Sequence, residues 1–518
     1  MAAIITEKFR LHNAEQFKES FTEASASNYY LFVGKSSPFT TTTKYSDTES
    51  TGGTDASPPN PHDRVIEENY KWDSMLAAKK ITSTDVMPVI PRRNYSQVTF
   101  DMYEHDVTAT NPTTSGASNI YDSTFYFVTD EYKVYKVLDN DGGAIINDTN
   151  APTSTSSAPF FHGRYYLQYM YTLQTIDTIK FLTTDFIAVR NDATVTTDVT
   201  TASGDSAPFH GAPIQVVRVT AVGASLPNGD YYTKVNGDGT GAIVKIKVAN
   251  SGIVKFGEAG TLMHAGGSGY TFGTIDLTKC YNNAGLSGTV VNLSGGGAAV
   301  HPIISPRIGH GHDPVSELGG HYVMMNARLE QTESGDFTVA NDFREVGIVV
   351  DPHNAGTTTV SSVAQVRMTY ALKLENITGD FEVDEKITQS STDATGRVVE
   401  WDATRSVLYY LQEQWENYGI SSDNSNSAYQ TKVLFNGANQ ITGAQSNATA
   451  TPKATADGTD DAAANNGDAT MASGLSFTDG YAVPELEHDS GNIIYVENRR
   501  PISRASDQTE DIKIVIEF

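Results

Sequence analysis

Cysteine and long apolar runs are almost absent from this chain of 518 residues. The single cysteine, Cys280, excludes an intramolecular disulfide and a cysteine zinc cluster, and we expect it to be a small buried apolar residue. No window approaches the roughly 20 apolar residues that a membrane-spanning helix needs. The N-terminus reaches Glu7 and Lys8 after a very short apolar run, so no signal peptide is predicted. We therefore expect a soluble protein that folds in a reducing cytosol.

Positive charge is also scarce. Lys and Arg number 36 against 62 Asp and Glu, which gives a formal net charge of −26. A surface this acidic repels phosphate groups and anionic lipid, so neither nucleic acid nor a membrane is expected as a partner. Glycine (43) and tyrosine (26) are plentiful instead. Turn-forming and β-favouring residues together are typical of many short strands joined by loops, and the length suggests several domain-sized parts.

Helical periodicity is limited to a few stretches near the N-terminus. Residues 13–24 carry an apolar stripe behind Asn13, which can cap a helix. Residues 64–79 place two large apolar side chains four residues apart, which predicts a second helix. Residues 86–95 contain two prolines, which argue against a helix and against a central strand because proline lacks the N–H of a β ladder.

Alternating apolar and polar residues predict strands along most of the remaining chain. Residues 125–138, followed by an Asn-Asp-Gly-Gly turn, have the pattern of a hairpin. Residues 165–173 and 364–374 each predict one strand. The chain closes with 511–518, where Ile512, Ile514, Ile516 and Phe518 share one face, which predicts a half-buried final strand.

Composition divides the chain into six segments and predicts a mainly β fold: a multi-domain antiparallel β-sandwich-like core with a few peripheral helices and inserted small β domains. The segments are residues 1–200 as a core β domain, 201–300 as a glycine-rich inserted β domain, 301–352 as a return to the core with a short helix, 353–442 as a second inserted β unit, 443–475 as a flexible low-complexity loop, and 476–518 as strands that complete the core.

One cluster has the composition of a metal site. His310 and His312 lie two apart on an extended segment and project the same way, and Asp313 adds a carboxylate. The alternative is that Asp313 caps a helix that begins with Pro314 and continues past Leu318, with the histidines exposed in the preceding loop. We favour the alternative, because a closed site needs more ligands than these. No metal and no other cofactor is predicted.

Two arginine doublets, Arg92-Arg93 and Arg499-Arg500, stand out in so acidic a chain, and each lies beside a proline. Guanidinium groups bind carboxylates in a bidentate manner, so the doublets are candidates for a partner interface. The alternative, which we favour, is pairing with the chain's own surplus of Asp and Glu. No recognisable catalytic motif is present, and the chain is predicted not to be an enzyme.

The last stretch resembles the C-terminus of the gene-eight-product family, the β-rich wedge subunits in the baseplate of contractile-tailed bacteriophages (myoviruses). The matching strings are Ser490-Gly491, Ile494-Tyr495, Glu497-Asn498-Arg499, Pro501-Ile502 and Asp507-Gln508-Thr509-Glu510. Strings at 6–10, 33–39, 58–63, 89–95 and 343–348 also resemble the family, in the same order. The resemblance covers about the first 190 residues and two pieces near 340–352 and 478–518.

This resemblance implies a structural protein of the virion tail baseplate, made in the cytoplasm of the host bacterium. Such a subunit would pair with itself as a homodimer, bind other baseplate wedge proteins and relay the rearrangement of the baseplate when the sheath contracts. Two alternatives remain open. One is a tail adhesin that binds host glycans through residues 201–300. The other is a polysaccharide-cleaving tail enzyme, because a chain with 62 carboxylates always offers acidic pairs.

Overall fold

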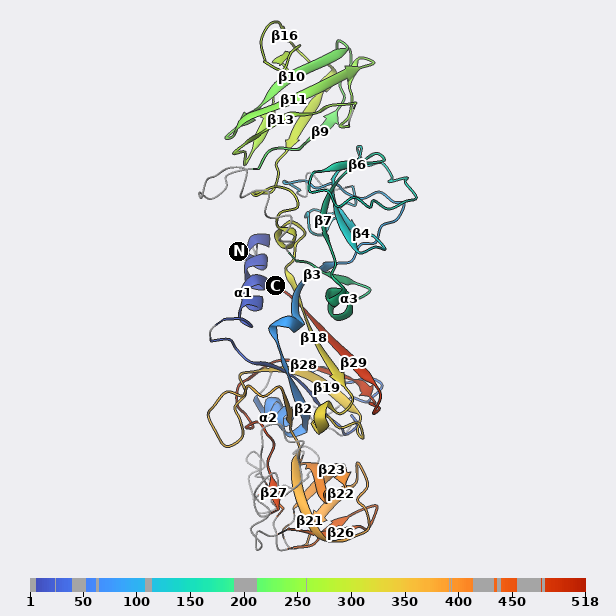
Figure 1. The fold of residues 1–518 in the computed structure, drawn as a ribbon, viewed down its shortest axis with the longest axis vertical. Coiled ribbons are helices and arrows are strands. Elements are labelled where there is room, and N and C mark those ends of the chain that lie inside the picture. The colour runs from blue at the N-terminus through green and yellow to red at the C-terminus, as the bar shows by residue number, and fades with distance from the viewer. Residues whose placement is uncertain are drawn as a thin grey trace. The chain divides into compact units, whose positions relative to one another are not determined.

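The computed structural model describes residues 6–23, 25–39, 53–61, 65–107, 114–190, 212–257, 259–390, 392, 394–412, 433–435, 439–453, 477 and 480–518. They form several antiparallel β-sheets and a few short helices, which confirms the predicted mainly β fold (Figure 1). No helix among these residues is long and apolar enough to cross a membrane.

The chain divides into two compact units. Unit 1 contains Met1–Lys18, Met87–Met324 and Val515–Phe518, and unit 2 contains Glu19–Val86 and Met325–Ile514. Each unit therefore joins N-terminal residues to residues from the last part of the chain. The division into six segments that composition suggests stays a prediction.

Unit 2 contains a five-stranded sheet of order β20-β2-β1-β19-β28. The strands are β1 (Tyr29–Gly34), β2 (Met75–Ile81), β19 (Phe343–Val350), β20 (Gln365–Arg367) and β28 (Asn492–Ile502). Every residue of β1 is buried, as expected for a strand with neighbours on both sides and covered faces. Gly347 of β19 lies opposite Phe32 of β1, and the missing side chain there leaves room for the Phe32 ring.

A second sheet of unit 2 closes on itself. Its order is β24-β23-β22-β25-β26-β21-β27, and β24 also pairs with β21, so six strands form a ring (Figure 1). A closed ring removes the exposed edges that open sheets carry. The bounds are β21 (Tyr370–Thr378), β22 (Lys386–Gln389), β23 (Thr395–Asp402), β24 (Val407–Leu411), β25 (Ile441–Gly443), β26 (Thr449–Pro452) and β27 (Tyr481–Ala482).

Unit 1 contains a four-stranded sheet of order β4-β5-β7-β6, and a further sheet of order β29-β18-β3-β8 has strands that pass from one unit into the other along the chain. The bounds are β3 (Val86–Pro91), β4 (Tyr126–Val128), β5 (Lys133–Asp139), β6 (Phe160–His162), β7 (Tyr165–Thr172), β8 (Phe186–Ala188), β18 (Tyr322–Glu330) and β29 (Thr509–Glu517). Strands β4 and β5 pair antiparallel, so the predicted hairpin is confirmed.

The glycine-rich part of unit 1 surrounds an apolar cluster of its own, in which Cys280 is fully buried as predicted. Its sheet has the order β12-β11-β10-β15-β16, with β13 on β11 and β14 on β10, and β9 pairs with β17 separately. The strands are β9 (Val216–Ala221), β10 (Gly229–Gly237), β11 (Thr240–Ala249), β12 (Gly252–Ile253), β13 (Leu262–Ser268), β14 (Gly273–Ile275), β15 (Cys280–Tyr281), β16 (Val290–Val291) and β17 (Ala299–Ile303).

Both N-terminal helices differ from the prediction. Helix α1 spans Glu7–Glu19, so Asn13 lies inside it rather than capping it, because the buried stripe already starts at Leu11. Helix α2 spans Val65–Ser74, and β2 begins at the next residue. Pairing of Met75 with Gly34 ends this helix early, since a sheet partner overrides helical propensity. The third helix, α3, spans Thr175–Phe181.

Three further predictions, two on strands and one on a loop, also need correction. Strand β3 has neighbours on both sides despite its prolines, because the Pro88 carbonyl oxygen still accepts from the Val189 N–H at 2.9 Å. The single strand predicted over 364–374 is divided between β20 and β21, which belong to different sheets. The first part of the loop predicted over 443–475 is instead occupied by β26, which buries Ala450 in the closed ring. Residues 454–475 lie outside the described residues.

The predicted final strand is present as β29. Ile514 is buried and Ile512 and Ile516 on the same face are half-buried, but Lys513 and Val515 on the other face are half-buried too, so the alternation in burial is weaker than predicted. The Phe518 ring packs on Phe17 with 5.3 Å between centroids, and its N–H donates to the His321 carbonyl oxygen at 3.2 Å. Arg10 of α1 donates from Nε to the Phe518 carbonyl oxygen at 2.5 Å. Phe518 is therefore held by helix α1 and by the residue that precedes β18.

Candidate functional site

The first arginine doublet makes internal contacts. Arg93 donates to the Tyr121 carbonyl oxygen at 3.1 Å, and its guanidinium lies 4.5 Å from the centre of the Tyr126 ring. Arg92 donates to the Asn94 side chain at 2.8 Å and to the Thr183 carbonyl oxygen at 3.1 Å. Among the described residues, the contacts of this doublet are with carbonyl oxygens, the Asn94 side chain and a ring, and none is with the acidic partners that we favoured. These contacts position the chain around β3 and β4, and a role in a partner interface stays a prediction.

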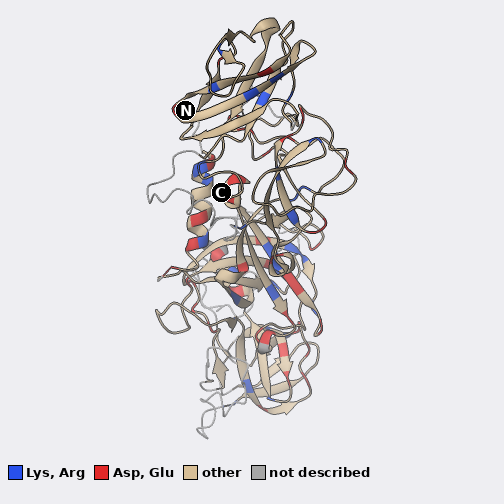
Figure 2. Cartoon of the chain, turned by 45° about the horizontal axis from the view of Figure 1, so that its top comes forward, with Lys and Arg blue, Asp and Glu red and all other residues tan. Residues whose placement is uncertain are grey.

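The second doublet lies on the outer strand of the five-stranded sheet. Arg499 pairs with Glu497 at 3.0 Å on the same strand, as the favoured alternative expected, while nearly half of its side chain stays exposed. Arg500 is exposed, and no ion pair to it occurs within the described part of the chain. Lys and Arg residues are otherwise scattered along both units (Figure 2).

The histidine cluster is not an exposed loop, because His310 is buried. Asp313 caps helix α5 (Pro314–Glu317) by accepting from the Ser316 N–H at 3.1 Å, so the predicted cap with proline at the first position is confirmed. The helix stops after four residues, because Gly319 adopts a positive φ of 79°. His310 is 3% exposed and meets the Tyr103 ring edge-on at 5.1 Å.

A buried ion pair lies close to His310. Lys136 of β5 pairs with Glu317 of α5, and both side chains are almost fully buried. Glu317 also accepts from the N–H groups of Gly311 and Asp313, each at 3.1 Å. Burial and the nearby Lys136 ammonium lower the pKa of His310 well below its usual value, so the ring is neutral. Sequence reasoning missed this pair, because its members lie 181 positions apart with no local pattern.

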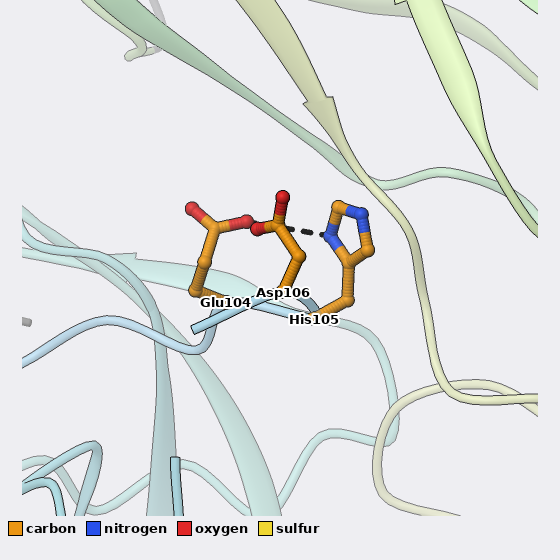
Figure 3. A group of neighbouring side chains, drawn as sticks. All are labelled: Glu104, His105 and Asp106. Carbon is orange, nitrogen blue, oxygen red and sulfur yellow. Dashed lines mark ion pairs between the residues drawn. The ribbon is translucent and has the colours of Figure 1, made fainter. Parts of the chain in front are cut away.

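A different group of possible metal ligands lies on the loop before β4. Glu104, His105 and Asp106 bring ligand atoms within 4.8 Å of one another, with 3.3 Å between a Glu104 carboxylate oxygen and His105 Nδ1 (Figure 3). The same Nδ1 accepts from the Ile304 N–H at 3.2 Å, and Glu104 also holds Arg218 at 3.1 Å. The ring nitrogen and one carboxylate are thus already engaged by the protein. We find no metal centre built there.

A cavity of about 290 Å³ lies beside this loop. Its described walls come from three parts of unit 1: residues 101–107 with Thr114, the end of β5 with its glycine turn, and β9 together with Lys255 and Phe256. The lining residues are Asp101, Met102, Glu104, Val107, Thr114, Asp139, Asn140, Gly142, Gly143, Arg218, Val219, Thr220, Lys255 and Phe256. The only sequence signal for it is the Asn-Asp-Gly-Gly turn, which predicts a hairpin and not a cavity.

Asp139 is the most perturbed group in this cavity. It is 5% exposed, and burial raises the pKa of its carboxyl group to about 7. Its Oδ1 accepts from the Asp141 N–H at 2.8 Å. The other oxygen has no hydrogen bond to the described residues, although it belongs to a side chain that lines the cavity. Lys255 reaches the Asp141 carbonyl oxygen at 3.3 Å, and Arg218 is held by Glu104.

A comparison with known protein families matches two separate segments of the chain. A family model described as Bacteriophage T4, Gp8 matches residues 3–159 and 462–518. No curated protein matches the chain. The matched residues supply β1, β2 and β28 of the five-stranded sheet, and the unmatched β19 lies between β1 and β28. That strand contains the 343–348 string, which also resembles the family.

The two matched segments thus meet in the same sheets although about 300 residues separate them. The order of strings along the chain, the β-rich fold and the family match agree with one another. Through residues 3–159 and 462–518, the chain is similar to the family of the bacteriophage T4 gene 8 product, a structural subunit of the phage baseplate.

Proposed function

We propose that this protein is a baseplate wedge subunit that pairs with itself, binds other wedge proteins and relays the rearrangement of the baseplate during sheath contraction. The observation that supports it most is the arrangement of the family-matched segments. Strands from both matched segments lie in one sheet of unit 2, with β1 and β28 on either side of the buried strand β19. A sheet that joins two distant segments of a chain resists local unfolding, and this property suits a subunit that transmits force.

Two of the described ion pairs hold their titratable groups in structural contacts. Lys136 and Glu317 neutralise each other out of contact with solvent, and Arg218 is engaged by Glu104. A catalytic acid or base must reach its substrate, and this buried pair offers no such access.

Strand β28 is the surface that we propose for a wedge partner. Within the described residues it has a neighbouring strand, β19, on one side only. It carries Arg499 and Arg500 exposed, and Ile494 is 50% exposed. An edge strand can accept a further strand through its backbone, and two guanidinium groups favour an acidic partner segment.

The test is charge reversal at this strand. The double variant Arg499→Glu/Arg500→Glu and the control Lys279→Glu, at an exposed position of unit 1, are each co-expressed with the other wedge proteins of the same phage. We expect the wild type and the control to form a dimer in light scattering and to co-purify with the wedge proteins. The double variant should lose the wedge partner by about ten-fold or more, since reversed charges repel.

Two outcomes separate the parts of the proposal. A wild-type protein that stays monomeric and ignores all wedge proteins overturns the wedge function. A double variant that binds them as well as the control does overturns the assignment of β28 while leaving the wedge function intact.

A further inference from the structure

We propose that the cavity between the end of β5 and the start of the glycine-rich part binds a neutral sugar ring. Its volume of about 290 Å³ lies near the lower end of the ~300–1,000 Å³ typical of small-molecule sites. That size suits one ring rather than an extended chain. The inference is independent of the wedge function.

Charge balance is the first argument for a neutral ligand. The walls carry two cations, Arg218 and Lys255, opposite two acids, Glu104 and Asp139. A third acid, Asp101, is already occupied, because its carboxylate accepts from the N–H groups of Ser115 at 2.8 Å and Thr124 at 2.9 Å. An anion would face Glu104 and Asp139, and a metal cation would face Arg218 and Lys255. A ligand with several hydroxyl groups can satisfy both kinds of wall, since each hydroxyl donates and accepts.

The second argument is the state of Asp139. This side chain is buried, and one of its oxygens lacks a hydrogen bond within the described residues. This oxygen is accessible from the cavity rather than sealed in the interior, so a ligand hydroxyl can donate to it in place of water.

An aromatic ring supplies the third element of a sugar site. Phe256 lines the cavity, and its ring is held by Tyr166 at 5.2 Å and by Phe161 at 6.0 Å between centroids. A ring fixed in this way offers an apolar surface to the C–H face of a sugar. Acceptor, donors and apolar wall therefore converge on one small space.

Only part of the cavity lies within the segments that match the family. Asp139 and Glu104 lie inside the matched residues, but Arg218, Lys255 and Phe256 lie outside them. The glycine-rich part thus completes a site that the matched segments alone do not contain.

The experiment uses the full-length chain and saturation-transfer difference NMR with the methyl glycosides of glucose, galactose and mannose, and of N-acetylglucosamine, at millimolar concentration. We expect a transfer signal from at least one glycoside. Lys255→Ala removes a donor at the exposed rim and should weaken binding by about ten-fold, in line with the loss of one charged hydrogen bond. Asp139→Asn, which keeps the side-chain shape, should weaken binding in the same way.

Lys279→Ala is the matched control, because Lys279 is exposed on the same glycine-rich part and does not line the cavity. It should bind like the wild type. Should Asp139→Asn fail to fold, Lys255→Ala still decides, since its side chain lies at the surface. No signal from any glycoside, equal binding by Lys255→Ala and the control, or selective binding of inorganic phosphate or Ca²⁺ overturns the proposal. Dextran and maltotriose distinguish the source of the sugar. If the protein binds them as well as the glycosides, the natural ligand is the end of a polysaccharide. If it binds the glycosides alone, the natural ligand is a free sugar.

Discussion

Lys136 and Lys133 lie on the same strand, yet their ion pairs should contribute very differently to stability. Lys136 and its partner Glu317 are buried, whereas Lys133 pairs with an exposed Glu131. We expect Lys136→Met to lower the free energy of unfolding by roughly 3–5 kcal/mol, because it leaves Glu317 charged and unpaired in the interior. Lys133→Met should cost about 1 kcal/mol or less. Urea unfolding followed by circular dichroism measures both, and equal losses would contradict the prediction.

Asp139 predicts a specific pH dependence. Its pKa of about 7 in the folded chain lies above the ordinary value of 3.8, through burial first. The hydrogen bond from the Asp141 N–H opposes this rise, as do Arg218 and Lys255, while the Asp141 carboxylate adds to it. The folded state therefore holds the proton more tightly than the unfolded state. This contribution to stability is present below about pH 4 and is lost as the pH rises to about 7.

The variant Asp139→Asn cannot ionise and should remove this loss. At pH 8 we expect it to be more stable than the wild type by roughly 2–4 kcal/mol, and near pH 4 the two should be alike. Thermal melts across this range measure the difference. Asp130→Asn, in the exposed turn of the β4–β5 hairpin, is the control and should leave the profile unchanged. A flat difference between Asp139→Asn and the wild type at all pH values would contradict the assignment.

At the scale of elements, the close packing of β1, β19 and β28 in unit 2 depends on Gly347. A Cβ at this position would overlap the Phe32 ring and lie 2.6 Å from the Tyr495 carbonyl oxygen, which belongs to the backbone of β28. Gly347→Ala should therefore cost 3 kcal/mol or more, at or beyond the usual range of about 1–3 kcal/mol for overpacking. Chemical unfolding monitored by tryptophan fluorescence, with Trp72 buried in the same core, reports this change.

Gly252→Ala is the matched control for this element. Gly252 also lies in a strand, but the nearest atom to an added Cβ is 3.5 Å away, an ordinary contact. The control should change stability by less than about 1 kcal/mol. A tolerated alanine at position 347 would show that β1, β19 and β28 can separate at this point without cost.

At the scale of the whole molecule, the glycine-rich part of unit 1 should be removable. Its two ends lie side by side, because Val216 of β9 pairs with Ile303 of β17, and these two residues pack into the core beneath β5 and β7. We replace residues 218–301 by Asn-Gly, a turn that suits a two-residue hairpin. The shortened chain should fold, keep its strand signal in circular dichroism and retain its oligomeric state in light scattering.

The same deletion removes Arg218 and Lys255, so the shortened chain should bind no glycoside. Aggregation of the shortened chain, with the wild type soluble under the same conditions, would show that the glycine-rich part is required for folding. Retained sugar binding would place the sugar site elsewhere in the molecule.

Local patterns in the sequence were sufficient for much of the secondary structure. The β4–β5 hairpin, the final strand, the cap at Asp313 and the burial of Cys280 were all correctly predicted. Each depends on residues within a few positions of one another. Of the candidate site, only single residues were found: His310 was expected in the open and is buried, and the arginines of the first doublet contact carbonyl oxygens rather than acids.

The sequence by itself determined that this protein is mainly β, and its ordered strings indicated the baseplate wedge family. Tertiary structure alone decided that Lys136 meets Glu317, that 364–374 is divided between two sheets, and that a cavity forms beside Asp139. The reason is physical. Alternation specifies which face of a strand is buried, but not which distant strand covers it, and charges far apart in the chain meet only after strand order and register are set.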